Sequence, residues 1–309
     1  MVGGTLRRYF EEVKNLKRGK NLFLYDADPQ KGFRDDINRA DIIFICVPTP
    51  PQKNGGADLS GIESALASLK GEKAAVIKST VPPGTTERCQ KKFPKLKLLF
   101  SPEFLTESRA WEDMLRPDRQ IVGHTEQSKN QAGPVLTILP QAFFSSPGTL
   151  GTYQFIRANA TEAELGKYGG NLFAAMKVAY ANILADIAGA LEGVEYENVR
   201  KLVSHDRRIG DSWMDVSHNM YRGFGGTCLP KDAAALLHTI ESLAATHPAA
   251  SKERKILKSA GDVIRAVIEY NKTLLESQGL TVEDVSVHDK EWIRRKLEIA
   301  KQRKTKKHG

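Results

Sequence analysis

The sequence predicts an α/β protein in which a doubly wound, Rossmann-like parallel sheet is followed by an all-helical domain. Short apolar runs alternate with helical stretches in the first half, and helical periodicity fills the second half. A segment rich in Pro and Gly separates the two patterns. With 309 residues and 40% apolar side chains, the chain can bury the cores of about two domains.

Five short apolar runs in the first half, each bounded by Pro, Gly or Asp, are expected to be strands buried on both faces. They are residues 21–26, 41–47, 74–79, 96–100 and 119–122. Helical spacing lies between the second and third runs, at Leu59, Ile62, Leu66 and Leu69. This alternation is typical of a doubly wound sheet.

Two long helices are predicted in the second half, because apolar residues recur at intervals of three and four over residues 160–193 and 256–275. Residues 145–152 (SSPGTLGT) are the expected hinge. We therefore expect a dinucleotide-binding domain at 1–150, a helical domain at 151–278 and a basic helical tail at 279–309.

The positive charge is concentrated at the C-terminus. Nine Lys or Arg and two Glu lie within residues 290–309, so this tail carries +7 of the net charge of +9. The body of the chain is therefore not expected to bind nucleic acid. Two interpretations of the tail stay open, a solvated basic helix end or a contact with RNA or another anionic surface.

A soluble cytoplasmic protein is expected, because no continuous apolar run approaches membrane length and the N-terminus lacks the order of a signal peptide. Three cysteines are too few for a disulfide framework and fit a reducing compartment. Cys46 is interpreted as a core residue and Cys89 as a surface residue. The seven histidines show no metal-ligand spacing, so no metal site is expected.

The N-terminus begins with a helix-like run that has Leu6, Tyr9 and Phe10 on one face, together with Val13, and no strand precedes it. In the dinucleotide fingerprint the last glycine opens the first helix, and an acid follows about 20 residues later. Gly3 and Asp26 have this relation. We therefore expect that the first strand and the first two glycines are missing from the chain as given, that the reading frame starts upstream, and that their loss weakens dinucleotide binding.

A candidate nucleophile lies in residues 223–232 (GFGGTCLPKD). Three glycines ahead of Cys228 let backbone approach a ligand closely, and the neighbouring Lys231 favours a thiolate. The alternative interpretation is a buried, inert cysteine in a glycine turn.

This segment resembles the catalytic signature of the UDP-glucose/GDP-mannose dehydrogenase family. Four further blocks match the family in order: ADIIFICVPTP at 40–50 with DLS at 58–60, KSTVPPGTT at 78–86, SPEFLTES at 101–108 and ELGKYGGN at 164–171. The matching motifs run from about residue 21 to residue 272.

The resemblance implies a two-step, NAD-dependent oxidation of a nucleotide sugar's primary alcohol to a carboxylate. The catalytic positions that it implies are Cys228, Lys167, Asn171, Asp232, Thr80 and Glu107. The substrate-binding positions are Glu103, Phe104, Leu105, Phe224, Gly225 and Arg208. The cofactor-binding positions are Gly3, Asp26, Val47, Pro48, Thr49, Thr80 and Lys231.

The resemblance also implies what each catalytic residue does. Cys228 attacks the aldehyde to give a thiohemiacetal and then a thioester. Lys167 and Asn171, four residues apart on one helix face, stabilise oxyanions, and Thr80 holds a water that acts as base. Glu107 activates the hydrolytic water. Asp232 orients water or Lys167, Glu103 contacts the substrate or orders the site, and Arg208 reaches a neighbouring subunit's substrate.

Three features depart from the family pattern. Only 38 residues follow Asn271, which leaves no room for the second α/β domain that covers the nucleotide in the family. Residues 218–222 stand where the family has a Pro-Gly turn. Gly169 and Gly170 interrupt a predicted helix, which suggests a close approach of its backbone to another group.

UDP-glucose is the favoured substrate, on the SPEFLTES and GFGGTC blocks, with GDP-mannose as the alternative. A dimer through residues 160–193 is expected from the resemblance. Two other functions stay open, a catalytically impaired relative that acts as a binding or partner-dependent module, and a one-step β-hydroxyacid dehydrogenase that needs a helix lysine but no thiol.

Overall fold

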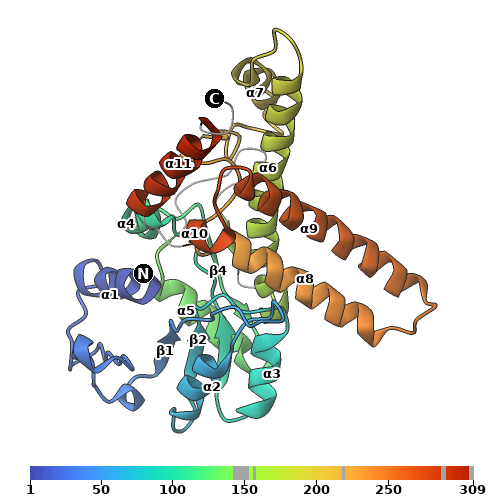
Figure 1. Ribbon diagram of the computed structural model, residues 1–309. Helices are drawn as coiled ribbons and strands as arrows, with labels where there is room; N and C mark the ends of the chain where they lie inside the picture. The colour runs from blue at the N-terminus through green and yellow to red at the C-terminus, as the bar shows by residue number, and fades with distance from the viewer. Residues whose placement is uncertain (142–152, 156–157, 218–219, 287–289, 306–309) are drawn as a thin grey trace. The chain divides into compact units, whose positions relative to one another are not determined.

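The computed structural model describes residues 1–141, 153–155, 158–217, 220–286 and 290–305 (Figure 1). The helices are α1 (Val2–Glu12), α2 (Ser60–Ala67), α3 (Thr85–Lys92), α4 (Ala110–Leu115), α5 (Ala132–Ile138), α6 (Ala160–Ala190), α7 (Tyr196–Ser204), α8 (Leu229–Thr246), α9 (Lys252–Glu276), α10 (Val282–Ser286) and α11 (Lys290–Thr305). The strands are β1 (Ile42–Ile45), β2 (Ala74–Ile77), β3 (Lys97–Phe100), β4 (Arg119–Ile121), β5 (Gly123–His124) and β6 (Tyr153–Phe155). The predicted α/β class with a helical second half is confirmed.

The chain divides into two compact units. Unit 1 consists of Met1–Pro50 and Ala57–Lys167, and unit 2 of Pro51–Gly56 and Tyr168–Gly309. The expected hinge at residues 145–152 lies outside the described residues.

Unit 1 contains a four-stranded sheet in the order β1-β2-β3-β5. The first three strands are parallel, with Ile42 opposite Ala74 and Ala74 opposite Lys97, and β5 runs antiparallel to β3. A separate parallel pair joins β4 to β6. The parallel order places the carboxyl ends of β1, β2 and β3 along one edge, which is where ligands bind in open α/β sheets.

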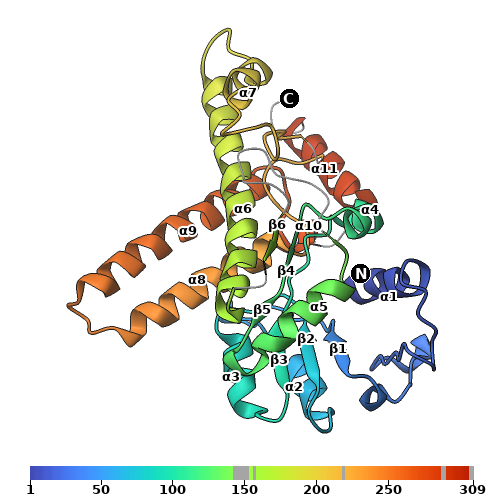
Figure 2. The ribbon, with the colours of Figure 1, turned by 180° about the vertical axis from the view of Figure 1, so that it is seen from behind.

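Helices cover both faces of this sheet (Figure 2). On β2, Ala75 and Ile77 belong to the core formed with α2, α3 and the start of α6. The alternate residues, Ala74 and Val76, belong to the core formed with α1, α4 and α5. Because both faces are buried, the strand is a continuous apolar run, as the sequence predicted.

The expected strand at residues 21–26 is not formed. Leu24 and Asp26 exchange backbone hydrogen bonds with residues 33–35 in place of a sheet neighbour, and the Asp35 carboxylate accepts the Leu24 N–H. Tyr25 is 56% exposed. The apolar run was therefore a correct sign of an extended segment, but a strand needs a hydrogen-bonding partner along its length, and this segment makes only isolated bridges.

The N-terminal run forms α1, and its predicted face is mostly confirmed. Leu6, Tyr9 and Phe10 are buried against the sheet, whereas Val13 caps the helix and is exposed. The interpretation of Cys89 as a surface residue is wrong. It is 5% exposed, because α3 turns Thr86, Cys89 and Gln90 inward and its lysines outward.

Unit 2 is built on α6, α8 and α9. Helices α8 and α9 lie side by side as a long hairpin, visible in both views (Figure 1), and bury Leu236 and Ile264 with Tyr168 of α6. A second cluster joins the end of α9 to α10 and α11 through Leu275, Val285 and Ile293. The second core ties the basic tail helix to this unit.

Among the described residues, α6 alone is long and apolar enough to cross a membrane by length and composition. A core helix passes the same test, and this helix buries Glu164, Lys167 and Lys177. The sequence showed no continuous apolar run there because these charged residues interrupt it.

Gly123 of β5 allows the sheet to contact the first turn of α6. A Cβ at this position would lie 2.7 Å from the Ala163 Cβ and 2.9 Å from the Ala160 Cα. We expect Gly123→Ala to lower the free energy of unfolding by about 1–3 kcal/mol, because the helix backbone must move to admit the methyl group. Urea denaturation followed by circular dichroism measures this change.

Gly166→Ala is the matched control, because no atom of the described part of the chain lies within 4 Å of a Cβ at that position of α6. This substitution should raise the free energy of unfolding by about 0.5–1 kcal/mol through helix propensity. Equal effects of the two substitutions would contradict the packing argument.

Candidate active site

The carboxyl ends of β1 and β2 hold two of the predicted segments together in unit 1. The Thr49 hydroxyl donates to the Thr80 carbonyl oxygen at 2.8 Å, and the Ser79 hydroxyl donates to the Val47 carbonyl oxygen at 2.7 Å. These bonds follow from the parallel pairing, which brings the two strand ends side by side. The predicted cofactor positions 47–49 and Thr80 therefore lie together.

Lys167 and Glu103 form a buried ion pair in the same unit. The Nζ to Oε1 distance is 3.4 Å, and the side chains are 6% and 9% exposed. The other oxygen of Glu103 accepts the Leu105 N–H at 2.6 Å. The Phe104 ring lies near two cations, 5.2 Å from the Lys167 Nζ and 3.7 Å from the Arg119 guanidinium. The structure thus brings together four residues that the sequence assigned to catalysis or substrate binding.

Lys78 is a further charged residue at this site and was not among the predicted site residues. Its Nζ donates to the Ser101 hydroxyl at 3.2 Å and to the Pro102 carbonyl oxygen at 3.1 Å. Desolvation by burial lowers its pKa to about 8, while Cys46 and Glu103 favour its charged form and Lys167 opposes it. The sequence does contain an indication of this role, because a lysine at the end of a buried apolar run is unusual unless it has a partner.

In unit 2, Cys228 is exposed at the N-cap of α8. One turn later the Asp232 carboxylate is 1% exposed and accepts hydrogen bonds from the Asn171 amide at 2.5 Å and from the Lys231 ammonium at 2.6 Å. This arrangement fixes the first turn of α8 to α6. The interpretation of Cys228 as a buried cysteine is excluded, because its thiol is accessible.

Lys167 and Asn171 both lie on α6, four residues apart, as predicted. Lys167 belongs to unit 1 and Asn171 to unit 2. A Cβ at Gly169 would meet nothing within 4 Å, so the close backbone approach expected there is not present among the residues that the structure describes. Phe224 is buried inside unit 2, where Asn271 holds its backbone.

Two predicted residues lie in exposed positions. Glu107 begins the short 3₁₀ helix Glu107–Arg109. Arg208, with its side chain 85% exposed, pairs with Asp206 at 2.6 Å.

Gly3 and Asp26 fit part of a dinucleotide site. A Cβ at Gly3 would lie 3.2 Å from the Cys46 Cβ, which is the close helix–strand packing expected of the last fingerprint glycine. Hydrogen bonding from Lys31 and from the Asp28 N–H lowers the pKa of Asp26, so its carboxylate is an acceptor of the kind that binds a ribose hydroxyl.

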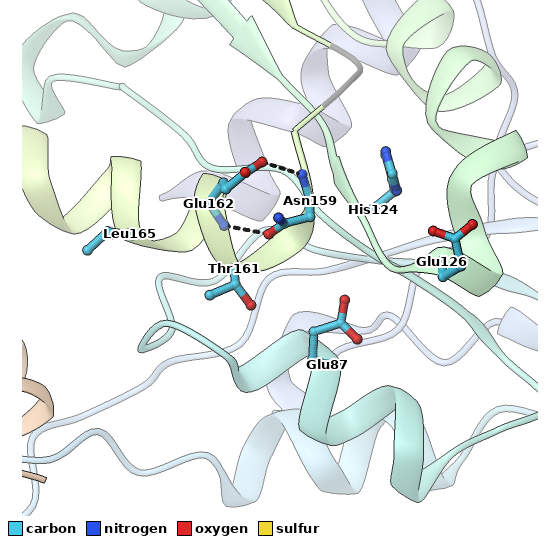
Figure 3. A pocket seen from close by; sticks show the side chains of 7 residues that line it. All are labelled: Glu87, His124, Glu126, Asn159, Thr161, Glu162 and Leu165. Carbon is cyan, nitrogen blue, oxygen red and sulfur yellow. Dashed lines mark hydrogen bonds between the residues drawn. The ribbon is translucent and has the colours of Figure 1, made fainter. Parts of the chain in front are cut away.

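A surface hollow of about 460 Å³ in unit 1 contains none of the predicted site residues (Figure 3). Its lining is Glu87, His124, Glu126, Asn159, Thr161, Glu162 and Leu165. Asn159 and Glu162 exchange two hydrogen bonds that cap the start of α6 (Figure 3). Among the residues that the structure describes, no group of three or more His, Cys, Asp or Glu is placed to hold a metal ion.

The parallel strands with helices on both faces are typical of a dinucleotide-binding domain, and a helical domain follows it in the chain. Residues 14–137 match the NAD-binding domain of the UDP-glucose/GDP-mannose dehydrogenase family, and residues 161–258 match its central domain. The chain belongs to this family, and its first domain is the family's NAD-binding domain.

Known proteins similar to the chain carry the same assignment. A UDP-glucose 6-dehydrogenase of Pseudomonas aeruginosa is 34% identical over 263 residues, which are 75% of this chain and 54% of that protein. One of Rhizobium meliloti is 31% identical and covers 77% of this chain and 58% of its own. The structure of a UDP-glucose dehydrogenase from Pyrobaculum islandicum matches with a TM-score of 0.58 at 32% identity, over 75% of this chain and 51% of its own. The chain thus spans about half the length of the relatives it matches.

The buried Lys78 gives a pH dependence to stability. Its folded-state pKa is about 8, below the 10.5 of an unperturbed lysine, so between these pH values the unfolded chain binds a proton that the folded chain has released. Relative to Lys78→Met, the wild-type free energy of unfolding should therefore rise with pH from about 8 to 10, by at most about 1.4 kcal/mol per pH unit.

Urea denaturation at several pH values measures the difference. Cys46, whose pKa burial raises to about 11, is present in both proteins. Lys92→Met, at an exposed position of α3, is the control and should show no such difference. A difference between wild type and Lys78→Met that is flat across this range would contradict the argument.

Proposed function

We propose that the chain carries the catalytic half of an NAD-dependent nucleotide-sugar dehydrogenase that oxidises UDP-glucose to UDP-glucuronate. The observation that carries this proposal is the accessible Cys228 at the start of α8, one turn from the buried Asp232 that bonds to Asn171 and Lys231. A one-step alcohol dehydrogenase needs no thiol at such a position. A second oxidation, from aldehyde to acid, does need one.

The overall reaction is a four-electron oxidation. One primary alcohol, two NAD⁺ and one water give one carboxylate, two NADH and three protons. NAD, when bound, supplies the two-electron acceptor for each step. Two hydrides must therefore leave the same sugar carbon, and between these events the aldehyde has to be retained.

Cys228 retains the aldehyde in this proposal. Its sulfur forms a bond to the aldehyde carbon as the carbonyl electron pair moves to oxygen, which gives a thiohemiacetal. Loss of a hydride from that carbon gives a thioester. Attack by water then breaks the carbon–sulfur bond and returns the thiol. Glu107 is our candidate for activating this water, because a carboxylate can take its proton.

We propose that polar and charged groups of the site stabilise negative charge on the oxygen atom bonded to the reacting carbon. In the proposal, the Lys167 ammonium and the Asn171 amide donate hydrogen bonds to that oxygen when it carries negative charge. Glu103 pairs with Lys167 at 3.4 Å, with both side chains less than a tenth exposed, and so holds the Lys167 side chain in place. Thr80 holds the water that accepts the first proton, and Asp26 binds a ribose hydroxyl of the cofactor.

UDP-glucose is proposed as the substrate because the relatives named above are UDP-glucose dehydrogenases.

A cytoplasmic location is proposed as well. The described cysteines, Cys46, Cys89 and Cys228, are all free thiols, which agrees with a reducing compartment.

The chain should form two NADH per UDP-glucose consumed, and Cys228→Ser should abolish the second oxidation. Absorbance at 340 nm gives NADH, and chromatography of the sugar nucleotides gives the substrate consumed. Cys89→Ser, a buried cysteine of α3, is the control and should keep the ratio at two. A version with a strand and a glycine loop added ahead of Met1 is measured in parallel, because Gly3 and Asp26 are the fingerprint positions that the given sequence contains.

The outcomes separate the alternatives. Full turnover by Cys228→Ser would indicate a one-step dehydrogenase. If neither the given chain nor the extended version forms NADH from UDP-glucose, although both are folded, the UDP-glucose proposal is overturned. NADH formation from GDP-mannose would then identify the other nucleotide sugar as the substrate.

We further propose that the chain forms a homodimer through α6. Four large apolar side chains on this helix, and a fifth directly after its last residue, are exposed at spacings of seven, three, four and four residues, which places the four on the helix along one face. They are Phe173, Tyr180, Ile183, Ile187 and Leu191. An exposed apolar stripe of this length is typical of a protein interface, and an antiparallel copy of the same stripe would cover it.

Ile183→Glu should convert the dimer to a monomer, because it places a charge in the centre of the apolar stripe. Sedimentation velocity measures the change. Leu202→Glu, an 81% exposed leucine of α7 outside the stripe, is the matched control and should leave the mass unchanged. A wild-type chain that sediments as a monomer at all accessible concentrations would overturn the proposal.

A further inference from the structure

The segment that leads to Cys228 is held by Arg222, at the position where the sequence departs from the family's Pro-Gly turn. The Arg222 guanidinium contacts α6 at three points. Its Nε donates to the Asn182 Oδ1 at 3.0 Å, and its Nη2 donates to the Asn182 carbonyl oxygen at 2.9 Å and pairs with Asp186 at 2.7 Å. Asp186 also accepts the hydroxyl of Tyr270 from α9.

The backbone of the same segment is bonded to α9 and to the turn that follows it. Arg222 exchanges two hydrogen bonds with the Gln278 side chain, at 2.8 and 2.9 Å. Phe224 exchanges two with the Asn271 side chain, at 2.7 and 3.0 Å. The N–H of Gly226 donates to the Val285 carbonyl oxygen at 2.8 Å. Hydrogen bonds therefore fix every second residue between positions 222 and 226.

The glycines of the segment serve this packing. A Cβ at Gly223, whose φ is +104°, would lie 2.6 Å from the Asn271 Oδ1. A Cβ at Gly225 would lie 2.8 Å from the Val285 Cβ. Both glycines are thus explained by contacts within unit 2, whereas the sequence motif predicted that they allow the approach of a ligand.

Beyond Cys228 the chain is fixed to α6 a second time, through Asp232 and Asn171. Asn171 and Asn182 are eleven residues apart on one helix, or about 16 Å along its axis. Cys228 lies between the two attachments in sequence. The chain is therefore attached to the same helix both before and after Cys228, which limits the positions that the cysteine can take.

We propose that Arg222 is a positioning residue that holds residues 221–227 on α6 through Asn182 and Asp186, and thereby fixes the place of Cys228. This inference rests on the proposed function for its catalytic consequence, since the thiol must reach the aldehyde before the aldehyde leaves. The contacts of Arg222 differ from an exposed surface ion pair. Asn182 is fully buried, so loss of the guanidinium leaves a buried acceptor without its donor.

The first test is amide hydrogen exchange, which needs neither substrate nor cofactor. Arg222→Ala should speed exchange of the Phe224 and Gly226 amides by about tenfold, because a buried hydrogen-bond acceptor is left unpaired. The amides in the middle of α9 should exchange as in wild type. Arg265→Ala, which removes an exposed arginine of α9 bonded to Glu241 and Asp262, is the control and should leave the segment unchanged. Unchanged exchange at Phe224 and Gly226 in Arg222→Ala would overturn the proposal.

The second test is the number of NADH formed per sugar consumed, with hydroxylamine present to trap released aldehyde. Arg222→Ala should lower this number from two towards one and release aldehyde, because a misplaced thiol captures the aldehyde less often. A variant that merely folds less well would form NADH more slowly at an unchanged ratio of two. Faster exchange of the segment with a ratio of two would therefore overturn the positioning role.

Arg222→Lys keeps a cation opposite Asp186 but lacks the forked contact with Asn182. Its amide exchange rates at Phe224 and Gly226, and its number of NADH formed per sugar, should lie between those of wild type and Arg222→Ala. If Arg222→Ala does not fold, both tests are made with Arg222→Lys. If the wild type forms no NADH, the proposed function has failed by itself, and hydrogen exchange alone then decides whether Arg222 holds the segment.

Discussion

The buried ion pair between Lys167 and Glu103 is the interaction on which the arrangement of unit 1 depends. Two charges that are less than a tenth exposed lose their hydration, and each is tolerated only because the other is present. The pair fixes the loop after β3 against α6. Lys78 holds the backbone of the same loop from the end of β2. The polar groups at the carboxyl edge of the sheet are therefore set in place by electrostatics as much as by apolar packing.

In unit 2, hydrogen bonds hold the residues around Cys228 in place. In the proposed reaction Cys228 is the nucleophile and has to be accessible, so burial of its own side chain cannot hold it. Residues before and after Cys228 in the sequence are held instead. Asp232 is hydrogen-bonded to Asn171, and Arg222 is hydrogen-bonded to Asn182. The helix α6 supplies both asparagines, because a long continuous helix is a rigid support for residues far apart in the chain.

Part of the candidate site could be predicted from the sequence, because its residues belong to short motifs of fixed spacing. The SPEF and ELGKYGGN blocks placed Glu103 and Lys167 among the site residues, and the structure joins them. The role of Lys78 could not be predicted in this way. Its two acceptors lie more than twenty residues away, on the next strand's loop, and only the pairing of β2 with β3 brings them within reach.

By itself, the sequence determined the alternation of strands and helices, the two long helices and the family, because apolar periodicity and short motifs are local properties. Only the tertiary structure decided that residues 21–26 pair with 33–35, that Cys89 faces inward, and that the glycines before Cys228 pack on α9 and Val285. Each of these depends on which distant segment supplies a hydrogen-bond partner or a surface, and such partners are chosen when the chain folds.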